Sequence, residues 1–260
     1  MKRVGIFIRN DARLVDVMRL LMEKTNLVYV IFKDENVEGD LVSFCLNHKI
    51  NYFSHASFVD MLSRNKLESL DIILSYYYQK KLEQSILDYP KNKCINFHPA
   101  PLPKYRGVGN YSKCIMDETN YWGVSAHFMD ETYDNGELIK VLTFEVFSRN
   151  ETYISLEQKT QKYMFELLRH VLNEIVENSI FSQKQEYYSI GVEYLSKKMI
   201  EEMKVISEED NSESIDKKIR AFWCPPFHGA GITLHGKRYT LINDSILNEL
   251  KELYELKGRS

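Results

Sequence analysis

The 260-residue sequence has few cysteines, no long apolar run and no excess of basic residues. Its four cysteines lie far apart and form no Cys-x-x-Cys pair, which argues against a structural zinc site and a secreted disulfide framework. No apolar run approaches the ~20 residues of a transmembrane helix. The formal net charge of -3 gives no positive field that would attract nucleic acid. We therefore expect no metal, nucleic-acid or membrane partner.

The N-terminus also lacks a secretion signal. Residues 1–6 lead directly into an apolar run, with no signal-peptide core and no small-residue cleavage site. Together with cysteines that are best explained as reduced thiols, this predicts a cytoplasmic protein. The hydrophobic content of 44% is ordinary for a globular chain, and the length allows one domain with an appendage.

The first third of the chain alternates strand-like and helix-like segments. Apolar runs typical of buried strands lie at residues 4–8, 27–32, 50–53 and 71–74. Helical spacing lies between them, at residues 14–22, 41–45 and 58–67. This alternation predicts an α/β protein with an open, mostly parallel, Rossmann-like sheet.

The loop after the first apolar run lacks Gly-x-Gly-x-x-Gly, which excludes a dinucleotide fingerprint. It contains Arg9 and Asn10 at the carboxyl end of a strand, where open α/β sheets bind ligands. Two interpretations are open: a solvated turn, or an anion site for a substrate phosphate.

A short apolar run at residues 94–97 is followed by a proline-rich turn from Pro99 to Pro103. Asn96 and His98 lie two residues apart, so both side chains point to one face of an extended strand. The amide can donate to a developing oxyanion, and the imidazole can move a proton near neutral pH. Alone, the pattern fits equally a capped strand end beside a proline turn.

A second motif follows downstream. Residues 122–129 alternate as a two-faced strand, on which His127 is interpreted as a support for the site or the sheet, and an acidic loop ends in Asp134-Asn-Gly. Together with Asn-x-His-Pro-x-x-Leu-Pro, this resembles the folate-dependent formyltransferases: the glycinamide ribonucleotide and methionyl-tRNA enzymes and the sugar N-formyltransferases. The resemblance is clear over residues 71–139. It implies the formyltransferase fold, N10-formyltetrahydrofolate as formyl donor without a metal, and Asn96, His98 and Asp134 as catalytic residues.

The resemblance also implies a folate-binding loop that offers mainly backbone groups. The cofactor-binding residues expected from it are Tyr78, Gln79, Lys80, Lys81, Leu82, Asp130 and Asp134. The chain departs from the transformylase pattern at Gln79, Lys80 and Lys81, where relatives favour apolar residues and an arginine. A lysine here, Lys80 above all, can reach a substrate phosphate or the folate glutamyl tail. For the preceding tyrosines, packing at the sheet edge is the alternative.

Further candidates for substrate binding follow the central motif and the long helix expected from Ser155-Leu-Glu-Gln158, a capping box. Tyr105, Arg106 and Asn110 belong either to a pocket or to a plain loop. Near the C-terminus, Phe222 and Trp223 precede a pair of prolines and a predicted hairpin at 232–241. This segment most resembles the nucleotide-sugar N-formyltransferases, where the appendage helps bind the nucleotide and forms a homodimer. The alternative is a small cap whose aromatic residues only pack.

The sequence thus predicts a catalytic domain at residues 1–183 and a region for nucleotide-sugar binding and dimerisation at 184–260. The expected reaction is transfer of a formyl group to the amine of a dTDP- or GDP-linked amino-dideoxyhexose, of the 4-amino-4,6-dideoxy type, for O-antigen or surface polysaccharide synthesis. Methionyl-tRNA or glycinamide ribonucleotide formyltransferase activity, or a catalytically silent folate-fold binding module, remain as alternatives.

Overall fold

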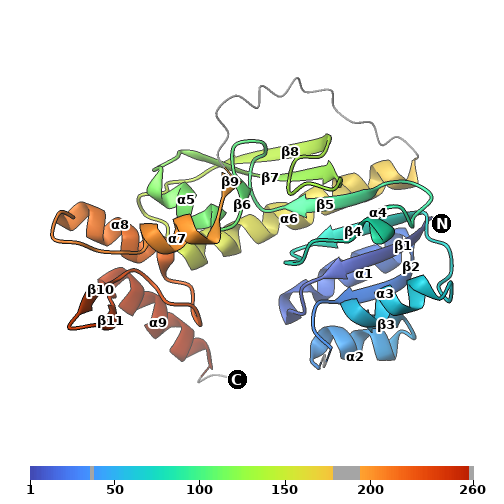
Figure 1. Cartoon of the computed structure of the whole chain (residues 1–260), viewed down its shortest axis with the longest axis horizontal. Coiled ribbons are helices and arrows are strands. Elements are labelled where there is room, and N and C mark those ends of the chain that lie inside the picture. The colour runs from blue at the N-terminus through green and yellow to red at the C-terminus, as the bar shows by residue number, and fades with distance from the viewer. Residues whose placement is uncertain (36–37, 178–193, 258–260) are drawn as a thin grey trace. The chain divides into compact units, whose positions relative to one another are not determined.

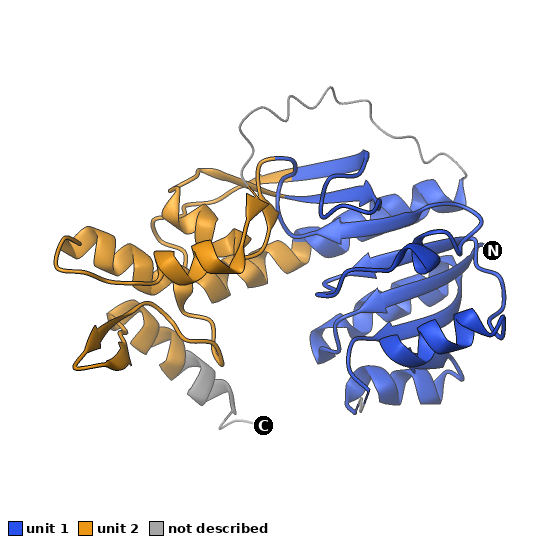
Figure 2. Ribbon diagram, viewed as in Figure 1, with its two compact units in different colours: residues 1–103, 124–142, 163–190 blue, residues 104–123, 143–162, 191–260 orange. Residues whose placement is uncertain are grey.

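The structure is a computed structural model that describes residues 1–35, 38–177 and 194–257. Its described residues form two compact units, shown in Figure 2: the first is drawn from 1–103, 124–142 and 163–190, the second from 104–123, 143–162 and 191–260. Both units are discontinuous because the chain returns to each of them. The boundary predicted near residue 183 lies outside the described residues, so the functional division at that point stays a prediction.

A seven-stranded sheet is the centre of the described fold, with the order β3-β2-β1-β4-β5-β7-β8 (Figure 1). The strands are β1 Arg3–Ile8, β2 Asn26–Phe32, β3 Asn51–Ser54, β4 Ile72–Tyr76, β5 Cys94–His98, β7 Tyr121–Phe128 and β8 Leu138–Glu145. β1 to β5 pair in parallel, and β7 pairs antiparallel with β5. The predicted mostly parallel α/β sheet is therefore confirmed.

Helices cover both faces of the sheet because alternate strand residues point to opposite sides. Ile6 of β1 lies in a core with residues of α1 (Val15–Lys24), α2 (Asp40–Asn47) and α6 (Tyr153–Val176). Phe7 lies in a second core with residues of α3 (His55–Ser63) and α4 (Gln84–Leu87). The 3-10 turn η1 (Ala12–Leu14) precedes α1. The apolar stripe of α6, from Met164 to Ile175, belongs to the first of these cores.

The start of α6 corrects one prediction. The helix begins at Tyr153, so Ser155 lies inside its first turn and does not cap it with Gln158. The Ser155 backbone N–H donates to Thr152 Oγ1 over 3.1 Å, and the Thr152 N–H donates to Ser155 Oγ over 2.9 Å. The reciprocal bonds of a capping box are therefore present three residues earlier than predicted, between Thr152 and Ser155.

The order of the strands predicts where a ligand-binding crevice lies. β1 has β2 on one side and β4 on the other, so the sheet order reverses between β1 and β4. In open α/β sheets, such a switch point opens a crevice at the carboxyl ends of the strands. Residues 9–10 follow β1 and residues 77–79 follow β4, and they line a common hollow of about 530 Å³.

The second unit contains the predicted C-terminal hairpin, formed by β10 (Gly231–Leu234) and β11 (Lys237–Thr240). Both turn residues, His235 and Gly236, have positive φ angles, as a two-residue hairpin turn requires. The other elements of this unit are β6 Arg106–Gly107, β9 Tyr194–Leu195, α5 Asn110–Met116, α7 Lys197–Met203, α8 Ser212–Phe222 and α9 Asp244–Lys257. Among the described residues, no helix is long and apolar enough to cross a membrane.

Candidate active site

The antiparallel pairing of β5 with β7 assembles the polar residues of the central motif. In this register Asn96 lies opposite His127, and His98 lies opposite Ser125. Directly opposed residues of an antiparallel pair lie on the same face and within contact distance. The period of two that aligns Asn96 with His98 therefore also aligns their two partners on β7.

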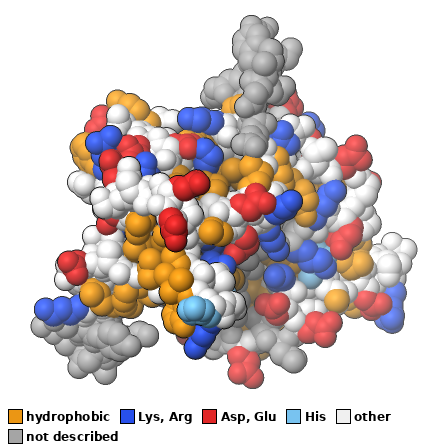
Figure 3. Space-filling model, turned by 60° about the vertical axis from the view of Figure 1, so that its left-hand side comes forward, with side chains coloured by type: hydrophobic (Ala, Val, Ile, Leu, Met, Phe, Trp, Pro, Cys, Tyr) orange, Lys and Arg blue, Asp and Glu red, His pale blue; other side chains and the backbone are white. Residues whose placement is uncertain are grey.

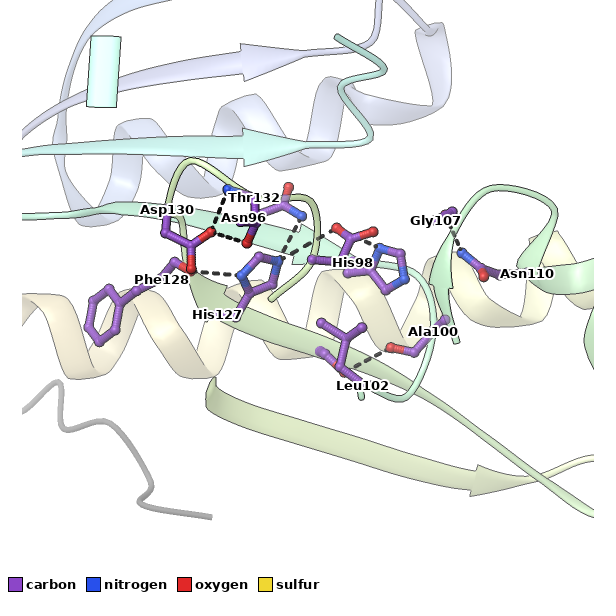
Figure 4. Close-up of polar contacts among 12 residues, drawn as sticks. Asn96, His98, Ala100, Leu102, Gly107, Asn110, His127, Phe128, Asp130 and Thr132 are labelled. Atoms are coloured by element: carbon purple, nitrogen blue, oxygen red, sulfur yellow. Dashed lines mark hydrogen bonds and ion pairs between the residues drawn. The ribbon is translucent and has the colours of Figure 1, made fainter. Parts of the chain in front are cut away.

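Asn96 and His127 form a hydrogen bond with a defined direction (Figure 4). His127 Nδ1 lies 2.8 Å from the Phe128 carbonyl oxygen, which only accepts, so Nδ1 carries the proton. Nε2 then accepts from the Asn96 amide nitrogen over 3.1 Å. This bond fixes which way the Asn96 amide faces and leaves the amide a second N–H donor.

Burial keeps His127 neutral. It lowers the pKa of His127 and outweighs the opposing effects of the Phe128 carbonyl and Asp134. A protonated ring would turn a second N–H toward the Asn96 amide donor, so the neutral form is also the one that the hydrogen bond requires. His127 thus supports the site, in agreement with the sequence-based interpretation.

Asp134 lies beside both histidines. Its Oδ1 is 3.5 Å from His98 Nδ1 and 3.9 Å from His127 Nε2, and all three side chains are largely buried. A carboxylate facing Nδ1 favours a proton on that nitrogen, which directs the basic lone pair of Nε2 to the other side of the ring. The structure therefore brings Asn96, His98 and Asp134 together as the sequence predicts, and their catalytic role stays a prediction.

The turn that carries Asp134 depends on its backbone geometry. Asp134 has a φ of 50°, in the left-handed region that aspartate and asparagine tolerate better than most residues. Two residues later, a Cβ at Gly136 would clash with the Phe128 carbonyl oxygen. Glycine thus lets this turn approach the end of β7 closely, and the approach carries the Asp134 carboxylate to the histidines.

Ser125, which sequence reasoning missed, fixes the proline turn. Its fully buried hydroxyl donates to the Ala100 carbonyl over 2.8 Å and accepts from the Leu102 N–H over 2.9 Å. Both partners lie in the turn that follows His98 (Figure 4). The signal was available in the alternation of residues 122–129, because Ser125 and His127 share a face of that strand.

The predicted folate loop and the acidic loop come close to each other. The Lys81 ammonium lies 5.6 Å from the ring centre of Tyr133, next to Asp134. Gln79, Lys80 and Lys81 are exposed, whereas Leu82 is buried and anchors the loop in the core. Asp130 accepts bonds from the Thr132 N–H and hydroxyl, so its carboxylate shapes the acidic loop.

A larger hollow of about 720 Å³ lies at the start of β5, at the opposite end of that strand from His98. Its lining combines the apolar groups Leu87, Cys94 and Met129 with the acidic side chains Asp130, Glu131 and Glu137. It includes neither residues 78–82 nor Asn96, His98 and Asp134. Burial raises the pKa of the Cys94 thiol to about 12, so the sulfur stays protonated and acts as an apolar wall.

The first loop contributes charge to the crevice between β1 and β4. Arg9 donates to Asp11 over 2.9 Å and lies 4.9 Å from the ring centre of Tyr77. Asn10 donates to the Glu38 carbonyl over 2.8 Å. Arg13 also pairs with Asp11, so two guanidinium groups share one carboxylate and the loop keeps a positive excess. That excess suits an anion.

The substrate residues predicted from the second unit are mostly internal. Tyr105 and Phe222 are 3% and 2% exposed, and Asn110 is buried with its amide donating to the Gly107 carbonyl over 3.0 Å. Their side chains pack within the unit, which argues against direct contact of Tyr105 and Phe222 with a ligand. Arg106 and Trp223 are partly exposed and stay candidates.

Comparisons with known proteins show what this chain is similar to. A protein-family model described as formyl transferase matches residues 22–172, more than half of the chain. The methionyl-tRNA formyltransferase of Buchnera aphidicola is 29% identical over 179 residues, which are 68% of this chain and 56% of that protein. The chain thus spans about half the length of that relative. The GDP-perosamine N-formyltransferase of Brucella melitensis is 26% identical over 182 residues, covering 69% of this chain and 67% of that protein.

Solved structures match over a larger part of the chain. A 4-N formyltransferase from Francisella tularensis has a TM-score of 0.75 at 21% identity, covering 93% of this chain and 97% of that one. An N-formyltransferase from Helicobacter canadensis, in complex with folinic acid and dTDP-3-aminofucose, has a TM-score of 0.72 at 21% identity, covering 92% and 86%. These likenesses show the shared fold. The match to the family model shows that the chain belongs to the formyl transferase family.

Proposed function

We propose that the protein transfers a formyl group from N10-formyltetrahydrofolate to the primary amine of a nucleotide-linked amino sugar. The observation that supports it most is the convergence of Asn96, His98 and Asp134 at the carboxyl end of β5, with His127 holding the Asn96 amide. Formyl transfer needs a hydrogen-bond donor to the developing oxyanion and a group that takes a proton from the attacking amine.

Each residue has a distinct part in this reaction. The Asn96 amide donates to the oxyanion that develops on the formyl oxygen, a contribution worth about 3–4 kcal/mol per donor in comparable sites. His98 Nε2 takes the proton from the attacking amine and can then donate to the same oxyanion, and Asp134 facing Nδ1 stabilises the imidazolium that results. The proton then passes to the leaving nitrogen as its bond to the formyl carbon breaks.

The formyl donor supplies an activated one-carbon group, and two loops of the first unit are proposed to hold it. The proposed contacts are the backbone of residues 78–82, the exposed side chains of Gln79, Lys80 and Lys81, and the carboxylates of Asp130 and Asp134. The Lys81 ammonium lies 5.6 Å from the ring centre of Tyr133, so the two loops come close enough to share a ligand. Folinic acid in the Helicobacter canadensis complex supports a folate in this fold.

Residues near the sheet switch point are proposed to hold the acceptor. Arg9 and Asn10 border the 530 Å³ hollow, and the positive excess of their loop suits the diphosphate of a nucleotide sugar. Lys80 lies on the neighbouring exposed loop and adds a second cation. Arg106 and Trp223 complete the proposed set. The dTDP-3-aminofucose complex of the Helicobacter canadensis protein supports this acceptor class.

A methionyl-tRNA substrate is the second candidate, because the methionyl-tRNA formyltransferase of Clostridium tetani is 36% identical over 132 residues. One observation weighs against it. The formal net charge is -3, whereas binding of nucleic acid depends on cationic surface.

The test is a product assay by mass spectrometry. The wild-type protein and Asn96→Ala are incubated with N10-formyltetrahydrofolate and a panel of dTDP- and GDP-linked amino sugars, with methionyl-tRNA in parallel. We expect the wild type alone to form an N-formyl sugar, and the panel to identify the nucleotide and the amino position. Formylated methionyl-tRNA without a formylated sugar would replace the proposed acceptor, and no product from any acceptor would contradict a transferase role.

A homodimer is also proposed, with the second unit as the interface. Exposed apolar side chains of this unit include Phe227, which is 70% exposed, and Leu234 and Tyr239 of the hairpin. Figure 3 turns this unit toward the viewer and shows hydrophobic patches on that face. Light scattering of the wild type and of the double variant Leu234→Lys/Tyr239→Lys tests the proposal: we expect a dimer and a monomer, respectively, and two dimers would contradict it.

A further inference from the structure

His55 is a buried histidine that the proposed reaction does not use. It begins α3 and is 2% exposed. Its Nδ1 lies 2.7 Å from the Tyr78 hydroxyl, and its Nε2 lies 2.8 and 3.0 Å from the two carboxylate oxygens of Glu83. Tyr78 and Glu83 are the two ends of the exposed loop between β4 and α4. One imidazole therefore contacts both ends of that loop, which we call the 78–83 loop.

The donors and acceptors of this contact are all matched. A carboxylate only accepts, so His55 Nε2 carries the proton and donates to Glu83. The Tyr78 hydroxyl then donates to the lone pair of Nδ1. Burial raises the pKa of Tyr78 well above its ordinary range, so the hydroxyl remains a donor. Burial acts to raise the pKa of Glu83, but the hydrogen bonds from His55 and from the backbone, together with neighbouring Lys80, outweigh it and lower the pKa, which keeps the acceptor charged.

The histidine is held on rigid structure. Ser54 caps α3 by accepting from the Ser57 N–H, which fixes the first turn on which His55 lies. The Phe7 ring of the central strand β1 packs edge-on against the His55 and Tyr78 rings, with ring centres 5.9 Å and 5.3 Å apart, respectively. The Glu83 side chain makes no cap bond to α4, although Glu83 occupies the position before that helix. Its carboxylate accepts from His55 Nε2 instead.

The part of the loop between the two contacts faces the proposed formyl-donor site. Gln79, Lys80 and Lys81 are exposed, and Lys81 lies over Tyr133, the neighbour of Asp134. A loop held at both ends has already lost conformational entropy that a free loop would lose on binding. Fixing Tyr78 and Glu83 on one imidazole therefore favours ligand binding without touching the ligand.

We propose that His55 is a positioning residue that fixes the 78–83 loop in the shape that binds the formyl donor. The inference rests on the proposed function, which assigns this loop to folate. It predicts an effect on binding: loss of the contact weakens binding of the donor, while kcat with both substrates saturating is retained, because the groups at β5 and β7 are unchanged.

The test uses Tyr78→Phe, which removes the hydroxyl contact to His55, and Glu83→Gln, which replaces the charged acceptor of His55 by a weaker neutral one. Both keep the size of the side chain. The dissociation constant of 5-formyltetrahydrofolate is measured by calorimetry, and the KM is measured for each substrate. We expect each variant to raise the dissociation constant and the donor KM about tenfold, which corresponds to about 1.4 kcal/mol. Tyr89→Phe is the matched control, because Tyr89 lies in the same core and donates to the Glu68 carbonyl, away from the loop.

His55→Gln extends the test to the histidine itself. In a variant that folds, Tyr78→Phe is expected to have a smaller effect than in the wild type, because its partner is already absent. Wild-type donor affinity in both Tyr78→Phe and Glu83→Gln would overturn the inference, whether or not His55→Gln folds. A fall in kcat with both substrates saturating would overturn it as well, since that pattern indicates a general effect on the fold.

Amide hydrogen exchange separates this inference from the proposed function. If the wild type binds no folate, the proposed function fails, and the exchange of Gln79–Lys81 still reports on the contact. Faster exchange of these amides in Glu83→Gln than in Tyr89→Phe supports a loop fixed by His55. Equal exchange rates in the two variants would overturn it.

Discussion

The carboxyl end of β5 and the second unit hold similar side chains and use them differently. At β5, polar side chains meet one another: the Asn96 amide contacts His127, and His98 faces Asp134. In the second unit, the Tyr105 hydroxyl bonds to Asp117 inside the unit, and its ring packs with Trp122. At the end of β5 the polar groups gather in one place, whereas in the second unit they form hydrogen bonds and packing contacts inside the unit.

The difference lies in how each region is built. Strand register places side chains at fixed offsets, so one antiparallel pair aligns two residues of β5 with two of β7. The second unit consists of short helices, a hairpin and connections, where no such offset applies. The residues proposed for the chemistry are thus recognisable from sequence spacing, whereas those proposed to select the acceptor are not.

The largest expected effect is that of Asp134→Asn at β5. Asparagine keeps the size of the side chain and tolerates the left-handed backbone, so only the negative charge beside His98 is lost. We expect kcat to fall about 100-fold with nucleotide-sugar affinity unchanged in calorimetry. Asp60→Asn, an exposed carboxylate paired with Arg64, is the control and keeps its kcat. Loss of sugar binding with the rate retained would reassign Asp134 to the acceptor.

Two glycine substitutions compare the regions directly. Gly136→Ala places a Cβ against the Phe128 carbonyl and forces a shift, so we expect a loss of about 2–3 kcal/mol in unfolding free energy and a lower kcat. Gly236→Ala has open space around it and only its positive φ to accommodate, at a cost of about 1 kcal/mol. Urea unfolding measures both, and equal losses would show that the Gly136 turn can relax.

Trp223→Ala tests whether the second unit contributes to substrate binding. A partly exposed aromatic next to a proline pair can stack on a nucleobase, with about 1–3 kcal/mol per base. We expect affinity for the free nucleoside diphosphate to fall about tenfold with the dimer intact. Phe147→Ala, an exposed aromatic of the same unit, is the control. A dissociated dimer with unchanged nucleotide affinity would make Trp223 structural.

The smallest effect concerns the pH dependence of stability. Burial lowers the pKa of His127 in the folded protein, whereas a histidine in the unfolded chain titrates near ~6.5. Below that pH the unfolded chain binds the additional proton, so stability contributed by neutral His127 is lost as the pH falls. His127→Gln removes this group, and we expect the unfolding free energy to change less between pH 7 and ~5. An unchanged slope would show that His127 titrates normally.

Much of the fold is predictable because buried parallel strands appear as continuous apolar runs. The strands beginning at Arg3, Asn26 and Ile72 lie within a residue or two of their predicted positions. The alignment of Asn96 with His98 follows from the period of two alone. The long helix starts earlier than predicted because Thr152 supplies the cap oxygen, which sequence spacing does not distinguish from Ser155.

The rest depends on contacts between distant segments. That His127 accepts from Asn96 follows from the pairing of β5 with β7, which a single sequence does not specify. His55 contacts Tyr78 and Glu83, which lie 23 and 28 positions further along the chain. No sequence motif links these residues. The burial of Phe222 depends on the packing of the second unit, so its aromatic character alone favours core and ligand equally.

The central claim is that the polar groups at the end of β5 perform the transfer step, and the single-turnover rate of His98→Asn tests it most directly. With N10-formyltetrahydrofolate and the amino sugar identified by the product assay both saturating, we expect transfer at least ~100-fold slower than in the wild type, with both dissociation constants unchanged. His48→Asn, the same change at an exposed position, keeps the wild-type rate. A His98→Asn rate close to that of the wild type would contradict the account.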